Sequence, residues 1–180
     1  RLVMSLRGRG IGGVGGGAAG GGVLRVEVTQ DDLRELTRAI AKHGDAKAVK
    51  SELRKGLREA VKPLVPIARQ RVLSQGTKGR GTGLRKDMAR AVQVKIDIGG
   101  RDPKVALRLD GKKLRGRPAG LVGMYEGVVP WRHPVFGTGT WVQQPARGFL
   151  TEVGRSNEAR IGRAVFDVMD DIGRKIDKGV

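Results

Sequence analysis

The chain has 180 residues, no cysteine, and 36 Lys and Arg against 18 Asp and Glu, which gives a net charge of +18. This length suits one domain with an attached arm, and the missing cysteines exclude disulfides, thiolate catalysis and cysteine-based metal sites. The charge predicts attraction to a polyanion, nucleic acid before an anionic membrane or an acidic protein, unless it serves only to keep a solvated surface soluble.

The sequence begins with an arm over residues 1–22 that is rich in glycine and carries Arg7 and Arg9. Glycine loses more backbone entropy on ordering than any other residue, so we expect the arm to be flexible in isolation. The sequence therefore predicts either a linker or a basic arm that docks on a neighbouring subunit, followed by a single domain over residues 23–180. No apolar run approaches the roughly 20 residues of a membrane span, and no signal peptide is recognisable, so we expect neither membrane association nor secretion.

Two helices are expected in the first half of the domain, after a short strand predicted by the alternating pattern of residues 23–29. The first helix covers residues 31–43, with Thr29 or Asp31 as its cap and Gly44 as its stop. Its apolar face consists of Leu33, Leu36 or Thr37, and Ile40.

The second helix starts at Asp45 and has the clearest pattern in the chain, an apolar stripe on one side and a basic face on the other. Pro63 and Pro66 lie within it and predict a kink or a break near Lys62, because proline removes a backbone donor and crowds the preceding turn. The basic face fits either a solvated surface, the commoner case, or a nucleic-acid contact. The stripe comprises Val49, Leu53, Leu57, Ala60, Leu64, Ala68 and Val72, and the basic face comprises residues 47, 50, 54, 55, 58 and 62.

Strands and a closing helix make up the second half of the domain. A short helical turn over residues 84–91 precedes two alternating stretches, 92–98 and 104–110, whose separating turn residues predict an antiparallel hairpin. From residue 148 an apolar stripe with helical spacing returns. Because helices and strands are segregated along the chain, we expect an α+β fold in which an antiparallel sheet packs against the long helix and the closing helix. The closing stripe comprises Ile161, Val165, Val168 or Met169, Ile172 and Ile176.

Two loops concentrate positive charge between these elements. They predict a salt-sensitive contact with the phosphates of DNA or with an acidic partner. The residues expected to make this contact are Lys78, Arg80, Lys112, Lys113, Arg115 and Arg117.

No set of residues in the sequence predicts catalysis. His43 and His133 are the two histidines, and they are far apart and lack the spacing of a metal site. Asp170 and Asp171 are adjacent on a predicted helix, so their side chains diverge and do not form an acid–base pair. We therefore expect a protein that is not an enzyme, with no catalytic residue, no cofactor and no metal.

The segment 129–150, VPWRHPVFGTGTWVQQPARGFL, holds both tryptophans of the chain. Its glycines and prolines predict a hairpin or a bulged loop. Trp131 and Trp141 stand in this loop rather than on a regular face, which is typical of anchors at subunit interfaces. Core packing is the alternative for both, and it is the interpretation that we prefer for Phe149.

Three short motifs in a fixed order resemble a known family. Residues 82–85 read TGLR after the long helix, residues 136–138 read FGT, and Pro145, Phe149 and Leu150 precede the last helix. This order is similar to that of the neck and tail-completion proteins of long-tailed bacteriophages, the group of head–tail connector proteins that includes minor tail protein Z-like proteins. In the family an acidic residue usually stands before the aromatic turn, where this chain has Val135, and the glycine arm has no counterpart in the family pattern.

The resemblance implies a structural virion protein, assembled in the bacterial host cytoplasm, that forms a homo-oligomeric ring at the head–tail neck around the DNA path. Its partners would be further copies of itself, neighbouring neck and tail proteins, and genomic DNA through nonspecific contact. Tail completion is the first position in the neck to consider; tail terminator and head-side stopper are alternatives, and a standalone nonspecific nucleic-acid-binding protein is an alternative of another class. The residues expected at subunit or partner interfaces are Arg7, Arg9, Trp131, Phe136, Gly137, Thr138 and Trp141.

Overall fold

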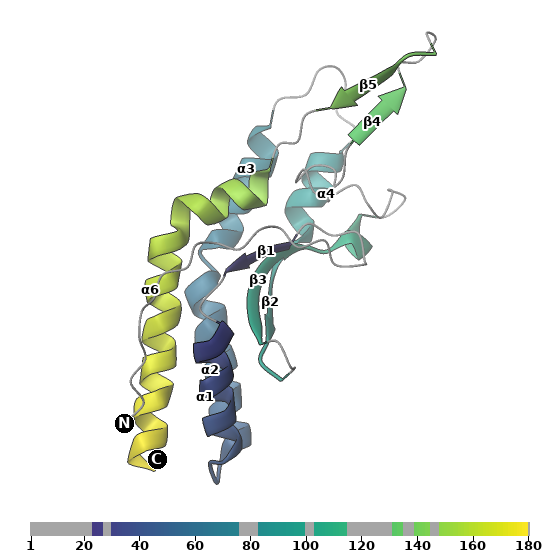
Figure 1. Cartoon of the computed structure of the whole chain (residues 1–180). Coiled ribbons are helices and arrows are strands. Elements are labelled where there is room, and N and C mark those ends of the chain that lie inside the picture. Colours follow the sequence, from purple (N-terminus) through teal and green to yellow (C-terminus); the bar gives the residue numbers. More distant parts are fainter. Residues whose placement is uncertain are drawn as a thin grey trace.

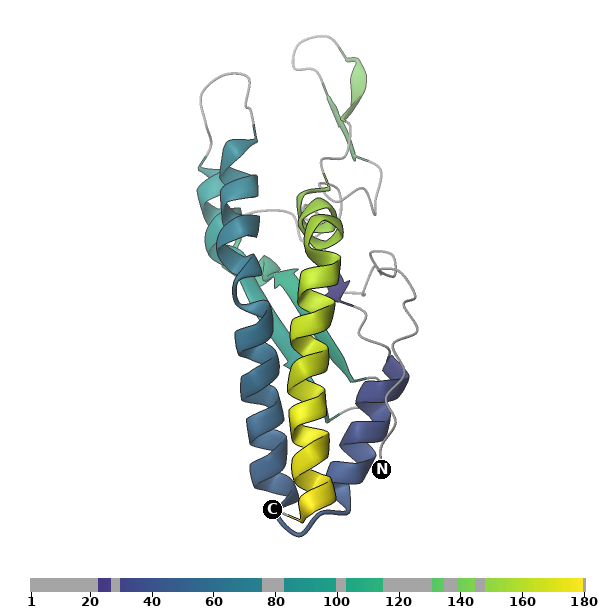
Figure 2. The same ribbon diagram turned by 90° about the vertical axis from the view of Figure 1, so that its left-hand side faces the viewer.

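The computed structural model of the chain describes residues 23–26, 30–75, 83–99, 103–114, 131–134, 139–144 and 148–179. Within these ranges helices are combined with antiparallel strands, which confirms the α+β class expected from the sequence. Three strands form one sheet, two further strands form a separate hairpin, and the long helices cover one face of the sheet (Figures 1 and 2). The arm predicted over residues 1–22 lies outside the described residues.

Helix α1 (Gln30–Ala41) is the first helix, and a short turn joins it to helix α2 (Ala46–Val61). Its apolar face is buried as predicted. Of the two expected caps, Thr29 lies outside the described residues, and Asp31 lies within the first turn of the helix instead of before it. In the turn, Nδ1 of His43 accepts a hydrogen bond from the backbone N–H of Asp45 at 3.3 Å. The buried face comprises Leu33, Leu36 and Ile40.

The break predicted near Lys62 is present between α2 and helix α3 (Leu64–Ser74). Pro63 occupies the position before α3, and Pro66 lies in its first turn, where a backbone N–H has no partner within the helix and its loss costs little. One correction concerns the apolar stripe: Val61 is fully buried and Ala60 only partly, because the stripe advances by four residues from Leu57. The buried residues are Val49, Leu53, Leu57, Val61, Leu64, Ala68 and Val72.

The three-stranded sheet consists of β1 (Val23–Val26), β2 (Val92–Asp97) and β3 (Lys104–Leu109) in the order β1-β3-β2. Strands β2 and β3 form the predicted antiparallel hairpin, with Asp97 opposite Lys104. Strand β1 pairs with β3 on its other side, also antiparallel. Alternate residues of β3 belong to the hydrophobic core beneath the helices, namely Val105, Leu107 and Leu109.

The described part of the TGLR motif, residues 83–85, forms the start of helix α4 (Leu84–Ala91), and Thr82 lies outside the described residues. Gly83 has a φ of 75°, a left-handed conformation that favours glycine, directly before α4 begins. The guanidinium of Arg85 donates hydrogen bonds to the backbone carbonyl of Gln75 and to that of Leu73, the latter at 3.1 Å. Carbonyls at a helix C-terminus have no partner within the helix, so Arg85 caps α3. In this structure the described part of the motif therefore stabilises the fold.

Helix α6 (Phe149–Lys178) has 30 residues and packs against α1, α2, α3 and β1. Phe149 and Leu150 are fully buried at its start, which confirms the core position preferred for Phe149. Of the alternatives Val168 and Met169, Met169 is buried and Val168 only partly. The other buried members of the predicted stripe are Ile161, Val165 and Ile172.

Helices α2 and α6 approach each other closely at Gly56. A Cβ atom at this position would lie 2.6 Å from Cγ1 of Val168, closer than packed carbon atoms come. The side chain of Val168 is branched at Cβ and has little rotamer freedom on a helix, so it cannot easily move away. Glycine at position 56 therefore sets the distance between the two helices.

We expect Gly56→Ala to lower the free energy of unfolding by about 1 kcal/mol, since overpacking costs about 1–3 kcal/mol and the helix propensity of alanine returns about 1 kcal/mol. Gly162→Ala is the matched control, because Gly162 lies inside α6 with nothing within 4 Å of its added Cβ. It should raise the free energy of unfolding by about 0.5–1 kcal/mol. Urea denaturation measures both values, and a stabilising Gly56→Ala would contradict the close approach.

Candidate subunit interface

The aromatic segment forms a two-stranded hairpin of β4 (Trp131–Pro134) and β5 (Trp141–Gln144). The strands are antiparallel, with Pro134 opposite Trp141 and Trp131 opposite Gln144. The hairpin was predicted from the glycines and prolines of this segment. It is not part of the three-stranded sheet and projects beyond the ends of the neighbouring helices (Figures 1 and 2).

The start of β5 exposes two large apolar side chains. Trp141 is 59% exposed and Val142 is 43% exposed. Successive residues of a strand point to opposite faces, so each face of the hairpin carries an uncovered apolar group at this end. A two-stranded hairpin with no covered face is marginally stable in water by itself. The core alternative is therefore wrong for Trp141 in this structure, and its side chain is available for contact with another molecule.

The remaining residues expected at an interface are placed only in part. Trp131 begins β4, and its backbone is paired with that of Gln144. The residues outside the described ranges are Arg7, Arg9, Phe136, Gly137 and Thr138.

The predicted basic loops also lie largely outside the described ranges. The backbone of Lys112 and Lys113 lies in a short 3-10 helix, η1 (Gly111–Lys113), where a loop was expected. The side chain of Lys113 is exposed. The residues outside the described ranges are Lys78, Arg80, Arg115 and Arg117.

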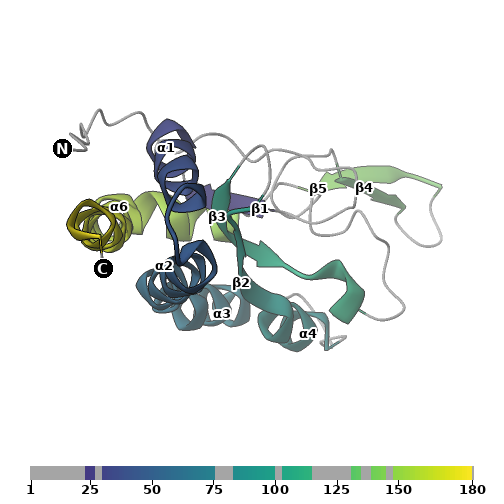
Figure 3. The same ribbon diagram turned by 90° about the horizontal axis from the view of Figure 1, so that it is seen from below.

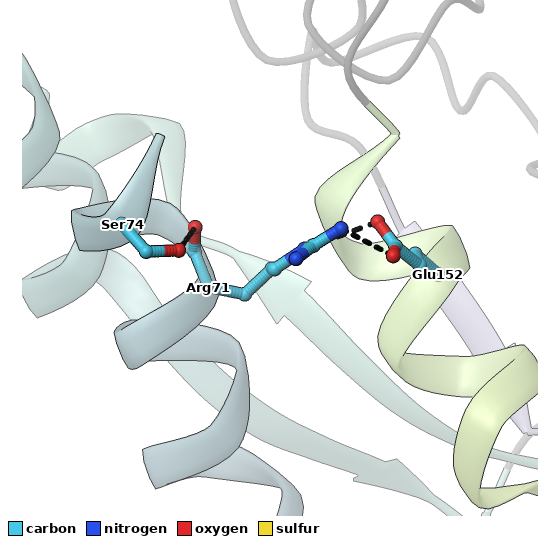
Figure 4. Close-up of polar contacts among 3 residues, drawn as sticks. All are labelled: Arg71, Ser74 and Glu152. Carbon is cyan, nitrogen blue, oxygen red and sulfur yellow. Dashed lines mark hydrogen bonds and ion pairs between the residues drawn. The ribbon is translucent and has the colours of Figure 1, made fainter. Parts of the chain in front are cut away.

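A groove of about 320 Å³ lies between α3 and the first turns of α6. Arg71 crosses it, and its guanidinium pairs with both carboxylate oxygens of Glu152, with Nε at 3.0 Å from Oε2 (Figure 4). Ser74 donates to the backbone carbonyl of Arg71 at 3.0 Å. Ile67, 37% exposed, and Val153 supply apolar lining. Both ions of the pair are about half exposed, so we expect this contact to contribute little more than 1 kcal/mol to stability.

A second groove, of about 460 Å³, lies between α2 and α6 around Gly56 and Val168. Lys175 of α6 forms an ion pair with Glu52 of α2 at its edge. Neither groove is lined by a histidine or a cysteine; the titratable residues lining them are Glu152 and Arg71 in the first and Glu52, Asp171, Arg174, Lys175 and Lys178 in the second.

The titratable groups of the described ranges do not gather into a site. Among these residues there is no cluster of three or more His, Cys, Asp or Glu that could hold a metal ion. Burial raises the pKa of Asp32, and the charges of Glu35 and Asp31 raise it further. Since the folded pKa exceeds the unfolded one, this group adds stability as the pH falls through the folded pKa. Asp32 lies in the first turn of α1, away from both grooves.

The basic face of α2 was not among the contact residues expected from the sequence, which were those of the basic loops. All six basic residues of this face lie within the described ranges. Lys47, Arg54, Lys55, Arg58 and Lys62 are exposed and Lys50 is half-buried. The signal was present in the spacing of these residues, but exposed basic helix faces are common and the pattern alone does not separate a binding surface from a solvated one.

Among the described residues, no helix combines the length and the apolar character needed to cross a bilayer. The chain was also compared with family models, with curated proteins and with solved structures. None of the three comparisons found a match.

Proposed function

We propose that this chain is a structural protein of the head–tail junction of a long-tailed bacteriophage, where copies assemble into a ring that joins the tail to the head connector around the DNA path. In this role it is a virion component without catalytic activity. Tail completion is the position that we assign to it, with terminator and stopper as alternatives in the same neck.

The observation that carries the proposal is the hairpin of β4 and β5, which projects from the fold and leaves Trp141 and Val142 uncovered. Tryptophan is enriched among the residues that dominate protein interfaces. A projecting element and its receiving surface differ, so such a contact is head-to-tail, and head-to-tail contacts close into rings when the rotation allows. The order of the TGLR, FGT and PARGFL motifs supports the same family.

The strand edges of the sheet give a further means of joining copies. Within the described residues, β1 and β2 each pair with β3 alone, so each leaves one edge unpaired. An unpaired edge offers backbone donors and acceptors to a strand of another chain.

A second candidate, the standalone nucleic-acid-binding protein, draws support from the net charge of +18 and from the exposed basic face of α2. It predicts duplex binding by a monomer and no ring. It gives no reason for an uncovered tryptophan on a projecting hairpin.

The two candidates are separated by the mass of the native protein. We expect oligomers of defined size in solution or on addition of the tail protein that the chain joins, and rings in electron micrographs of the same sample. A monomer under both conditions, together with absence of the chain from purified virions, would overturn the proposal.

The arm gives a separate prediction. Deletion of residues 1–22 should leave the domain folded by circular dichroism, because buried residues from Leu33 to Ile172 already form a continuous hydrophobic core. It should weaken incorporation into particles, since a flexible segment that orders on a neighbour adds contacts only in the assembly. Quantitative immunoblotting of purified particles measures this, and undiminished incorporation would show that the arm does not dock.

A further inference from the structure

The basic side chains of α2 share one face of the helix. At 3.6 residues per turn, residues 47, 50, 54, 55, 58 and 62 fall within an arc of about 140°. All are Lys or Arg, and the other residues in this arc are Ser51, which is exposed, and Val61, which is buried in the last turn of α2. In the view along the helices, α1, α6 and the sheet surround the other sides of α2 (Figure 3). The basic face is therefore directed away from the core.

This face lacks the carboxylates that accompany basic residues elsewhere in the structure. On α6, Arg174 pairs with Asp170 at 2.7 Å and with Asp171 at 2.9 Å. On α1, Arg34 pairs with Asp31 at 3.6 Å. Glu59 and Glu52 of α2 lie outside the arc and pair with Lys62 and with Lys175 of α6. Within the described ranges no carboxylate pairs with the remaining five residues, which are Lys47, Lys50, Arg54, Lys55 and Arg58.

Such an arrangement is unfavourable for the isolated helix. Lys50, Arg54 and Arg58 follow one another at four-residue spacing, and like charges at that spacing repel. Nothing within the described fold offsets this repulsion, so a polyanion that binds the face would relieve it.

The length and the side-chain composition of the face favour duplex DNA over single-stranded nucleic acid and over an acidic protein. From Lys47 to Arg58 the helix rises about 16 Å, which spans about five phosphates of one strand of B-DNA along its axis. The arc contains no aromatic side chain on which an unpaired base could stack. It also exposes no large apolar side chain of the kind that forms the centre of a protein interface, since its one apolar residue, Val61, is buried.

We propose that this face of α2 is a binding surface for the phosphate backbone of duplex DNA, independent of base sequence. The inference does not depend on the role in the phage neck, because it concerns a surface opposite the core and not the hairpin. In a ring around the DNA path it would supply the contact that was first expected from the loops.

The test measures binding of the full-length protein to a fluorescent 20-base-pair duplex between 50 and 200 mM salt, a range over which phosphate contacts weaken steeply. The variant is Lys47→Gln, Arg54→Gln and Arg58→Gln together. The matched control carries Arg155→Gln, Arg160→Gln and Arg163→Gln on exposed positions of α6, with the same change in net charge. Circular dichroism checks that both variants keep the fold.

Each phosphate contact contributes about 0.9 to the slope of log K against log salt, so the α2 variant should reduce the slope by about 2.7 and the control by less than about 1. Equal losses in the two variants would assign binding to overall charge and overturn the proposal. So would absence of duplex binding at 50 mM salt, or tighter, α2-dependent binding of polyglutamate, which would assign the face to an acidic protein.

A second measurement avoids dependence on charge. A photoreactive amino acid at position 51, in the centre of the face, should crosslink to the duplex. The same group at exposed position 159 on α6 should not. Equal crosslinking from both positions would contradict a localised surface. Because ring formation is measured by mass and this surface by DNA binding, either result can fail without the other.

Discussion

Phe149→Ala is expected to lower the free energy of unfolding by about 3–5 kcal/mol, the largest effect of any single truncation considered for this chain. Phe149 is 0% exposed and is the first residue of α6, directly after the segment that carries the hairpin. Removing its ring leaves a cavity among Leu150, Val153 and the rest of the core, and it loosens the start of α6. Urea denaturation monitored by circular dichroism gives the value.

The matched control is Phe166→Ala on the same helix. Phe166 is only partly buried and does not belong to the core cluster, so its loss should cost less than about 1.5 kcal/mol, half or less of the value for burying a phenylalanine fully. Equal costs at the two positions would mean that Phe149 does not anchor the helix in the way that its burial indicates.

Trp141→Ala is expected to have the opposite profile, with a large effect on assembly and a small one on the monomer. Truncation of a tryptophan at the centre of an interface commonly costs about 2–4 kcal/mol of binding, which corresponds to a 30-fold to 1,000-fold weaker association. Since Trp141 is 59% exposed in the described chain, the free energy of unfolding of the monomer should change by less than about 1 kcal/mol. Native mass measurement gives the first value and thermal denaturation gives the second.

Leu73→Ala is the control for this substitution, because Leu73 is 46% exposed and lies on α3, outside the hairpin. It removes an exposed apolar side chain that is not part of the hairpin, and association should change by less than about threefold. An unfolded Trp141→Ala variant would show that the side chain belongs to the core. A folded variant that assembles like the unaltered protein would remove the hairpin from the interface.

Patterns within one element were the most predictable part of the fold. The helical stripes of α1, α2 and α6 and the β2–β3 hairpin follow from periodicity, since each depends on residues that are close in sequence. Ala60 was predicted in the buried stripe of α2, whereas the structure buries Val61 fully and Ala60 only partly. Periodicity does not separate the two positions, because steps of three and of four residues keep nearly the same side of a helix. The pairing of β1 with β3 joins residues about eighty positions apart, and no local pattern specifies such a partner.

The candidate interface could be found from the sequence but its exposure could not. Tryptophan among glycines and prolines pointed to Trp141, while the same composition is compatible with a hairpin folded onto the core. Only the arrangement of β4 and β5 apart from the three-stranded sheet decides between these cases. The opposite holds for the motif around Arg85, which was singled out by resemblance and in the structure caps α3.

The 30 residues of α6 follow an axis about 45 Å long, which bends in its N-terminal part (Figure 1), starts near the hairpin and ends near the turn between α1 and α2 (Figure 2). A tilt of about 5° at the hairpin end shifts the far end by about 4 Å over that length. If each copy held the next one through its hairpin alone, small errors in the angle of this contact would accumulate from each copy to the next. In a closed circle the last copy must fit the first, so the angle between the hairpin and the long part of α6 would determine how many copies complete it.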